Sequence, residues 1–373
     1  MLRGEIEAMA VSKYAYVYAR TRARMSELMD ERRLRELVDT RSEDFLSSLM
    51  DTAAYKDKIT KAALVGVEAR KIEKTLKEDL IDQYLMVIKS TEGAGAIRDV
   101  FVEFLRRLEV KNLKAVIRAK AAEVHGTGTE TGTGTSTAEA PMFFPVEDFF
   151  KRRISRLIEA DSIENVIKQS ENPYKRVLED ALPEYEKSKR VLVLENALDE
   201  EISAAVREKV ERLSGADKEI ARKIVGTEFG LANLMILLRC KSEGIAEAEI
   251  RRYLLPDGFS FDFYPDVGAM NDSISAENVS SAVQLMPASA YKEVLTGALS
   301  SYEAEKSLVP LENALAQYFF VTIKSIRRGY PINIGTIIGF LYLKEIEIRN
   351  LCTIAVCKEN EIPAEETMKM VML

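Results

Sequence analysis

The chain has 373 residues, 47% of them hydrophobic, which is enough for more than one globular core and too many for a disordered protein. A formal net charge of −7 argues against a general nucleic-acid binder, because such proteins usually gather Lys and Arg on one face. Only 18 glycines and 10 prolines interrupt a sequence rich in helix-forming residues, so we expect a nearly all-α protein.

The N-terminus lacks the basic start, apolar stretch and small-residue cleavage site of a signal peptide. The first predicted helix follows at residues 13–24 (KYAYVYARTRAR), with four positive charges and three tyrosines. One interpretation is an amphipathic core helix with solvated arginines. The other is a face that binds an acidic partner through Lys13, Arg20, Arg22 and Arg24.

Residues 126–140 (GTGTETGTGTSTAEA) offer no apolar face, so we expect a flexible, dispensable insertion. Further on, apolar residues recur with a period near 3.6 over Leu194–Arg212, which predicts an amphipathic helix. Pro256-Asp257-Gly258 marks a turn, and the aromatic run 259–266 is interpreted as a packed connector. The longest apolar stretch, Ile332–Leu343, is too short to cross a membrane and suits a buried helix.

Self-comparison reveals an internal repeat with a period of 117 residues. This shift superimposes Tyr174-Lys175 on Tyr291-Lys292, Leu194–Leu198 on Leu311–Leu315, Asn233-Leu234 on Asn350-Leu351 and Cys240-Lys241 on Cys357-Lys358. A weaker first copy contains Tyr55-Lys56 and Asn112-Leu113 with Lys120. The repeat predicts helical units at 1–121, 146–249 and 250–373, with a flexible insertion at 122–145.

Each copy opens with a serine and acidic residues before an apolar run, so Ser42, Ser162 and Ser275 are predicted helix N-caps. Tyr55, Tyr174, Tyr291, Asn112, Asn233 and Asn350 are predicted to pack in corresponding places.

The repeated Asn-Leu…Lys motif has two interpretations. In the structural one, the Asn amide bonds a neighbouring helix end, Leu packs inward and Lys reaches solvent. In the functional one, Asn or Lys side chains ring a pseudo-threefold axis and contact a partner. The interface candidates at the motif ends are Arg118, Lys120, Arg239, Lys241 and Lys358.

The sequence offers little for catalysis. It has no phosphate-binding loop or Gly-x-Ser-x-Gly motif, and its single histidine, His125, borders the Gly/Thr tract. Carboxylates such as Glu345 and Glu347 are interpreted as members of a solvated helix face. Cys240, Cys352 and Cys357 have no Cys-x-x-Cys spacing and suit small core positions in a reducing compartment. We expect no catalytic residue, cofactor or metal.

Three stretches resemble the C subunit of archaeal and bacterial A/V-type rotary ATPases, the counterpart of the d subunit in eukaryotic vacuolar pumps. They are YAYVYARTRARM (14–25), TEFGLANLMILLRCKSEGI (227–245) with EIRRYLLPDG (249–258), and LKEIEIRNLCTIAVCKENEIPAEE (343–366). The resemblance covers nearly the whole chain and includes the threefold internal duplication. The Gly/Thr insertion departs from it.

The resemblance implies a funnel of three similar helical units around a pseudo-threefold axis. Its partners would be the rotor shaft and the membrane proteolipid ring, on the cytoplasmic face of the cell membrane. It would transmit torque between proton or sodium translocation and ATP synthesis or hydrolysis, as a non-catalytic peripheral subunit. The alternative is a free cytosolic helical-repeat scaffold that binds proteins, although a period of 117 residues is long for a solenoid.

Overall fold

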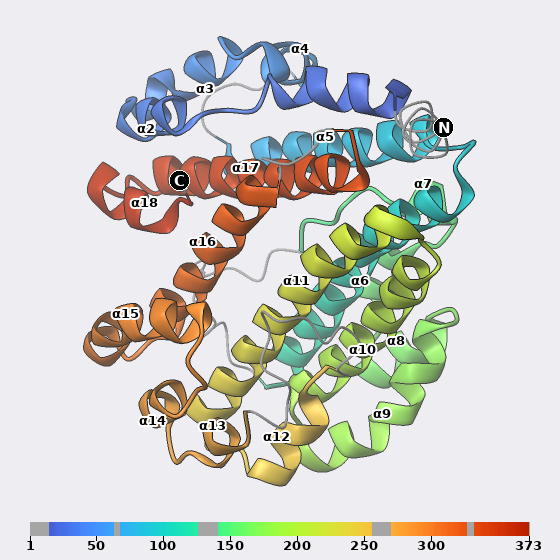
Figure 1. Cartoon of the computed structure of the whole chain (residues 1–373), viewed down its shortest axis with the longest axis vertical. Helices are drawn as coiled ribbons and strands as arrows, with labels where there is room; N and C mark the ends of the chain where they lie inside the picture. Colours follow the sequence, from blue (N-terminus) through green and yellow to red (C-terminus); the bar gives the residue numbers. More distant parts are fainter. Residues whose placement is uncertain (1–14, 63–67, 126–140, 256–269, 327–331, 373) are drawn as a thin grey trace, which may run out of the picture.

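The protein is described here by a computed structural model, and the residues it describes are 15–62, 68–125, 141–255, 270–326 and 332–372. All regular elements within these ranges are helical (Figure 1), which confirms the predicted all-α class. Lys13, the Gly/Thr tract 126–140, the predicted Pro256-Asp257-Gly258 turn and the aromatic run 259–266 lie outside the described residues.

A helix over residues 15–25 opens the described chain. In the first copy it is followed by α2 (Glu31–Asp39), α3 (Ser42–Met50), α4 (Ala53–Ala62), α5 (Ala69–Ser90) and α6 (Gly95–His125). The second copy contains α7 (Glu147–Phe150), the 3-10 helix η1 (Ile154–Glu159), α8 (Ile163–Gln169), α9 (Tyr174–Ser188), α10 (Val191–Glu211), α11 (Gly215–Ser242) and α12 (Glu247–Tyr253). The third contains α13 (Asn271–Ser275), α14 (Val279–Gln284), α15 (Ala290–Glu305), α16 (Val309–Ile326), α17 (Ile334–Glu359) and α18 (Ala364–Met370).

Six long helices form a closed cycle of contacts. Each copy supplies a hairpin of two of them: α5 with α6, α10 with α11, and α16 with α17. The hairpins then pack on one another, because α10 lies against α6, α16 against α11, and α5 against α17. We call these three contacts the α6–α10, α11–α16 and α17–α5 seams. The α17–α5 seam joins the first copy to the third, and α17 runs directly beside α5 in Figure 1.

The predicted apolar stripe forms the buried face of α10. Leu194, Leu198, Ile202, Val206 and Val210 are all buried, which matches a helical period of 3.6 residues. The predicted apolar stretch 332–343 is the buried first half of α17, apart from the half-buried residues that precede the helix. These two elements contribute to a single continuous hydrophobic core that extends through all three copies.

One of the three predicted N-caps is confirmed. The Ser162 side chain accepts the N–H of Asn165 at the start of α8. Ser42 is instead the first residue of α3, and its hydroxyl donates to the carbonyl of Lys358 at 3.1 Å. Ser275 ends α13, so Asn278 caps the following helix. The prediction failed there because Asn is an equally good cap and lies closer to the apolar run.

Candidate functional site

The three repeated asparagines hold the backbone of a segment further along the chain. Each amide group donates to a backbone carbonyl and each side-chain oxygen accepts the N–H of the same residue, at 2.6–3.1 Å. The three pairs are Asn112–Phe144, Asn233–Leu255 and Asn350–Met372. All three asparagines are buried, so each clamp satisfies backbone groups that would be costly to leave unpaired. This geometry matches the structural interpretation of the Asn part of the motif.

The repeated tyrosines reach across the seams to the long helix of another copy. The buried Tyr174 hydroxyl donates to Glu109 of α6 at 2.6 Å, and the buried Tyr55 hydroxyl donates to Glu347 of α17. Glu109 and Glu347 both lie three residues before the repeated asparagine of their helix. Corresponding tyrosines therefore bind corresponding carboxylates at two seams.

The third tyrosine meets neutral groups. The Tyr291 hydroxyl faces Thr227 of α11 and Tyr318 of α16. The ring centroids of Tyr291 and Tyr318 lie 5.1 Å apart. Burial, together with Tyr318, raises the pKa of Tyr291. The α11 position three residues before Asn233 is Gly230, so no carboxylate stands there. At the α11–α16 seam, this repeat position therefore offers no carboxylate to the tyrosine.

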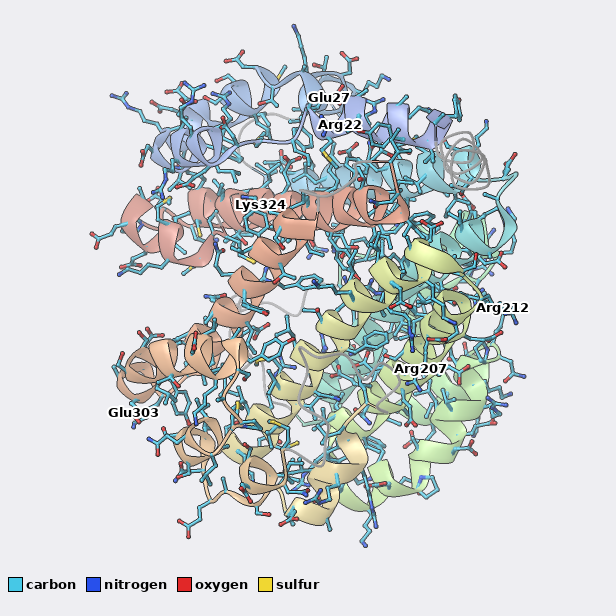
Figure 2. The ribbon with its side chains drawn as sticks, viewed as in Figure 1. Arg22, Glu27, Arg207, Arg212, Glu303 and Lys324 are labelled. Carbon is cyan, nitrogen blue, oxygen red and sulfur yellow. The ribbon has the colours of Figure 1, made fainter. Side chains whose placement is uncertain are left out.

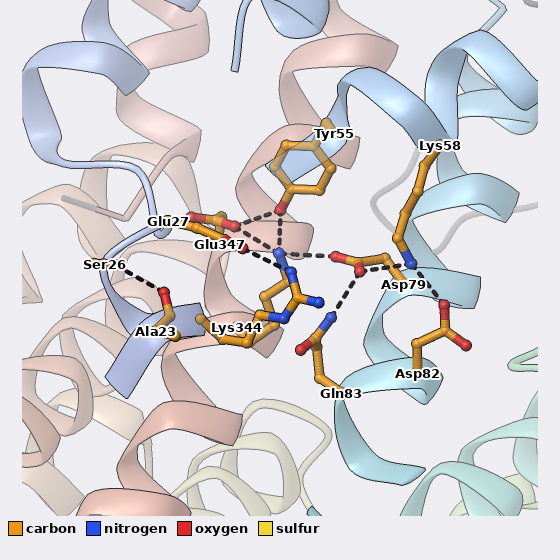
Figure 3. Close-up of polar contacts among 11 residues, drawn as sticks. Ala23, Ser26, Glu27, Tyr55, Lys58, Asp79, Asp82, Gln83, Lys344 and Glu347 are labelled. Carbon is orange, nitrogen blue, oxygen red and sulfur yellow. Dashed lines mark hydrogen bonds and ion pairs between the residues drawn. The ribbon is translucent and has the colours of Figure 1, made fainter. Parts of the chain in front are cut away.

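The most extensive polar cluster lies in the α17–α5 seam (Figure 3). The buried Lys344 Nζ of α17 contacts Asp79 of α5 at 2.8 Å, Glu347 at 3.0 Å and the Tyr55 hydroxyl at 2.7 Å. Lys58 approaches the other Asp79 oxygen at 2.9 Å. Each buried charge in this cluster therefore has a partner of opposite sign, which a buried ion requires.

The electrostatics of Asp79 follow from this cluster. Burial acts to raise its pKa, but Lys344 and Lys58 outweigh burial and leave the pKa of Asp79 lowered. A polar cavity of about 210 Å³ opens beside the cluster, and Arg20 and Arg24 are among the residues that line it. Among its described lining residues, the deeply buried charged groups are Asp79 and Lys344, which neutralise each other.

A second ionic cluster joins the long helices of all three copies. Arg107 of α6 pairs with Glu228 of α11, and it also donates to the Tyr342 hydroxyl of α17 at 2.8 Å. Glu345 of α17 lies near enough for Arg107 and Lys111 to lower its pKa against the opposing effect of burial. Arg107, Glu228 and Glu345 each lie five residues before the repeated asparagine. One repeat position therefore supplies charges from three helices to one cluster.

These clusters correct the interpretation of Glu345 and Glu347 as a solvated face. Glu347 is 4% exposed and binds Tyr55, Lys344 and the Met29 N–H, while Glu345 binds Tyr84 and Lys111. Sequence reasoning missed Glu109, Asp79 and Lys344 as well. A usable signal existed for the glutamates, because a Glu three residues before Asn recurs in the first and third copies.

The first-helix candidates lie over residues 15–25, at the end of the molecule where Arg22 and Glu27 are labelled in Figure 2. Arg20 contacts the Tyr16 hydroxyl at 3.4 Å and Ser90 at 3.3 Å, and Arg24 pairs with Glu27 at 3.0 Å. Arg20, Arg22 and Arg24 are all exposed, so they are accessible to a partner.

The motif-end arginines form ion pairs between copies. Arg118 of α6 pairs with Glu195 of α10, and Arg239 of α11 pairs with Glu312 of α16 at 3.5 Å. These are corresponding positions in the repeat. Val356 takes the place of the arginine on α17, where it is 40% exposed.

The structure contradicts the expectation that the motif lysines reach solvent. Lys358 donates to the backbone carbonyls of Val38, at 2.5 Å, and Thr40, just past the end of α2. Carbonyls at a helix C-terminus lack internal partners, which explains why a cation lies there. Lys120 is 7% exposed and pairs with Glu123, while Lys241 is half-buried.

The described part of the chain contains no group of three or more His, Cys, Asp or Glu residues placed to hold a metal ion. Cys240 and Cys357 are buried and Cys352 is half-buried, and all three are free thiols. No helix among the described residues is both long and apolar enough to span a bilayer. The fold and its buried contacts thus define a helical-repeat protein whose polar chemistry joins its own parts.

Comparison with known proteins identifies the family. The model of the ATP synthase (C/AC39) subunit family matches residues 17–370. The chain is 31% identical to the C subunit of the A-type ATP synthase of Methanothermobacter thermautotrophicus, over 93% of this chain and 84% of that protein. It is 27% identical to the same subunit of Methanosphaera stadtmanae, over 96% and 88%, and 25% identical to that of Methanocaldococcus jannaschii, over 97% and 87%. The chain belongs to the ATP synthase (C/AC39) subunit family.

Proposed function

We propose that this chain is the non-catalytic central-stalk adapter of an A/V-type ATP synthase or ATPase. In this role it joins the rotor shaft to the proteolipid ring at the cytoplasmic face of the cell membrane, as a peripheral subunit. It transmits torque between ion translocation and ATP synthesis or hydrolysis, and itself binds neither nucleotide nor ion. Family membership supports this proposal, since the relatives are named as ATP synthase subunits.

We further propose that the three copies form a funnel around a pseudo-threefold axis. The observation that carries this proposal is the set of corresponding contacts: an Asn clamp in every copy, a Tyr contact at every seam and one shared cluster around Arg107. An adapter under torque benefits from such repetition, because load is shared among several buried contacts.

The clamps also suggest where the units end. The Asn233 clamp ties Leu255 to the second copy, and the boundary at 249/250 falls inside α12, so we place the end of that unit after Leu255. By the same reasoning Phe144 closes the first unit. The Gly/Thr insertion then lies inside the first unit, between α6 and its closing segment, and is not a linker between units.

The closed cycle favours this function over a free cytosolic scaffold. In an open solenoid each repeat contacts only its neighbours, so the first and last repeats stay apart. Here α5 of the first copy packs on α17 of the last, with the buried ion pair Asp79–Lys344 between them. A closed unit of this kind suits a rigid spacer between two partners.

Fractionation tests the proposed function. The chain, carrying an affinity tag, is purified from detergent-solubilised membranes and from the soluble fraction of the same cells. We expect it to bring down the proteolipid ring and the shaft subunits from membranes, as identified by mass spectrometry. Recovery from the soluble fraction alone, without those subunits, would favour the scaffold.

A further inference from the structure

We infer that the last turn of α17 is a latch, in which Lys358 and Glu359 hold the ends of α2 and α5 and so keep the short helices of the first copy on the third. The corresponding turns of α6 and α11 carry Lys120-Ala121 and Lys241-Ser242 instead. The inference concerns the chain itself and holds whether or not the chain binds a rotor.

Both latch residues meet helix ends of the first copy. The Lys358 ammonium donates to the carbonyl of Val38, in the last turn of α2, at 2.5 Å and to that of Thr40 just after it. The Glu359 side chain accepts the N–H of Ala69, the first residue of α5, at 3.1 Å. Groups at helix ends lack partners inside the helix, and the helix dipole favours a cation at the C-terminus and an anion at the N-terminus. Each latch residue therefore has the sign of charge that its helix end favours.

A third contact adds α3 to the latch. The hydroxyl of Ser42, the first residue of α3, donates to the backbone carbonyl of Lys358 at 3.1 Å. In Figure 1, α2 and α3 lie over the end of α17 that leads into α18, and α18 packs on α2. One turn of α17 thus contacts three helices of the first copy.

The order of the helices in the chain explains why a latch is useful at this junction. The short helices of the second copy pack on α6 and those of the third on α11, and in both cases the chain leads from that long helix into them. The first copy differs, because α3 packs on α17 while the chain leads from α4 into α5. Tyr55 and its partner Glu347 are 292 residues apart. A direct connection raises the effective concentration of a docking segment, so this junction depends more on non-covalent contacts.

The corresponding turns of the other two copies differ in sequence and in contacts. On α6, Lys120 pairs with Glu123 of the same helix at 3.0 Å, and the next residue is the buried Ala121. On α11, Lys241 is followed by Ser242, whose hydroxyl donates to a carbonyl of its own helix. Neither Ala nor Ser can present a carboxylate to a helix N-terminus. The pair of opposite charges at this position therefore belongs to the third copy.

The expected strength of the latch follows from its exposure. Lys358 is half-buried and Glu359 is exposed, so the charges and the helix ends become hydrated when α2 and α3 lift from α17. The opening then loses only hydrogen bonds and the attraction between charge and dipole, which changes an equilibrium by roughly two- to tenfold. Leu37, Phe45 and Leu49 are buried and keep these helices on the core, so we expect local opening and not unfolding.

Amide hydrogen exchange on the purified full chain tests the latch. Lys358→Met keeps an apolar stem and removes the cation, so the amides of α2 and α3 should exchange about three- to tenfold faster while those of α8 stay within about twofold. Lys358→Arg keeps the cation and should retain most of the protection. In the matched control Lys241→Met, the amides of α13 and α14 should stay within about twofold of the native chain.

Glu359→Ala gives an independent measurement, because this side chain is exposed and its removal leaves no cavity. The amide of Ala69 should exchange at least about threefold faster in this variant. Unchanged exchange of α2 and α3 in Lys358→Met, or equal acceleration of α2, α3 and α8, would overturn the inference. Equal acceleration by Lys358→Met and Lys358→Arg would also overturn it, since it would show that packing and not charge holds the helices.

Discussion

At the scale of single residues, the repeated asparagine is explained by its side-chain chemistry. One amide group offers both a donor and an acceptor, so it pairs with the C=O and the N–H of the same backbone residue. An ionised carboxylate cannot donate, an apolar side chain can do neither, and a hydroxyl would have to make both bonds through a single oxygen atom. The motif therefore persists in all three copies for a reason that is independent of any partner.

Replacing the asparagine of one clamp tests how much its two hydrogen bonds contribute to the free energy of unfolding. Asn233→Ala leaves the buried C=O and N–H of Leu255 unpaired, so we expect the free energy of unfolding to fall by about 2–4 kcal/mol. Asn233→Asp keeps the bond to the N–H, but it sets a second carboxylate oxygen against the Leu255 carbonyl and buries a charge, so its loss should be at least as large. Chemical denaturation of both variants measures the difference. A loss below about 0.5 kcal/mol in the alanine variant would show that water replaces the clamp.

Glu103 of α6 provides a prediction on pH. Its side chain is 4% exposed and pairs with Arg106 at 3.2 Å, and burial raises its pKa despite that pair. Because the pKa of Glu103 is higher in the folded state, its protonated side chain contributes to the stability of the fold. This contribution is complete below the unfolded pKa of about 4.3 and is lost as the pH rises through the folded pKa. Ionised Glu103 therefore costs stability at pH 7.

We expect Glu103→Gln to be more stable than the native chain at pH 7, with the difference shrinking as the pH falls toward about 4. Urea unfolding of both proteins across this range measures the difference, and other titrating groups cancel in the comparison. A difference that is constant with pH would mean that the carboxyl has an ordinary pKa.

At the scale of elements, the α17–α5 seam depends on one buried lysine. Lys344→Met removes the cation that Asp79 and Glu347 share, so we expect a loss of about 3–5 kcal/mol. The matched control is Lys111→Met, whose side chain is 49% exposed and pairs with Glu345, with an expected loss of about 0–1 kcal/mol. Thermal unfolding compares them, and equal losses would contradict the role of burial.

Helix class and the repeat were predictable from the sequence because both rest on local pattern. The stripe from Leu194 to Val210 and the 117-residue shift require no tertiary information. The burial of Glu347 was not predictable in this way, since it depends on Tyr55 and Lys344, and Tyr55 lies 292 residues away. For the same reason Lys358 was misplaced: its partners are carbonyls at the end of α2.

At the scale of the whole molecule, the insertion can be tested through the clamps. The Asn and its partner are 22 residues apart in the second and third copies and 32 apart in the first, so the first interval is ten residues longer. Removal of ten residues from 126–140 should leave the Asn112–Phe144 clamp intact. Loop-closure entropy changes by only about 0.3 kcal/mol for such a shortening.

Thermal unfolding of the shortened chain is the measurement. A melting temperature within a few degrees of the native value is expected, while loss of folding would show that the insertion contributes contacts of its own. Limited proteolysis of the native chain should cut first within 126–140, because Gly and Thr there have much backbone entropy to lose on ordering.

The proposed docking to a rotor concerns the molecule as a whole, and the exposed arginines of the helix over residues 15–25 are our basic candidates for that contact. Unlike Arg118 and Arg239, the side chains of Arg20, Arg22 and Arg24 make no ion pair to another copy among the contacts of the described residues. Charge complementarity sets the orientation and rate of assembly more than its strength, and salt screens it, so reversal should weaken attachment most at low salt.

The test is the triple variant Arg20→Glu, Arg22→Glu, Arg24→Glu. Its helix content should match the native chain, while less catalytic head should remain on washed membranes and coupled ATP synthesis should fall. The matched control reverses three other exposed arginines of the first copy, Arg32, Arg35 and Arg41, which gives the same change in net charge.

If both triple variants lose retention equally, the effect reflects net charge and not this helix. If neither loses retention, the helix belongs to the packing of the first copy, as in its alternative interpretation. Loss confined to the first variant places the rotor contact beside Tyr16 and Arg20.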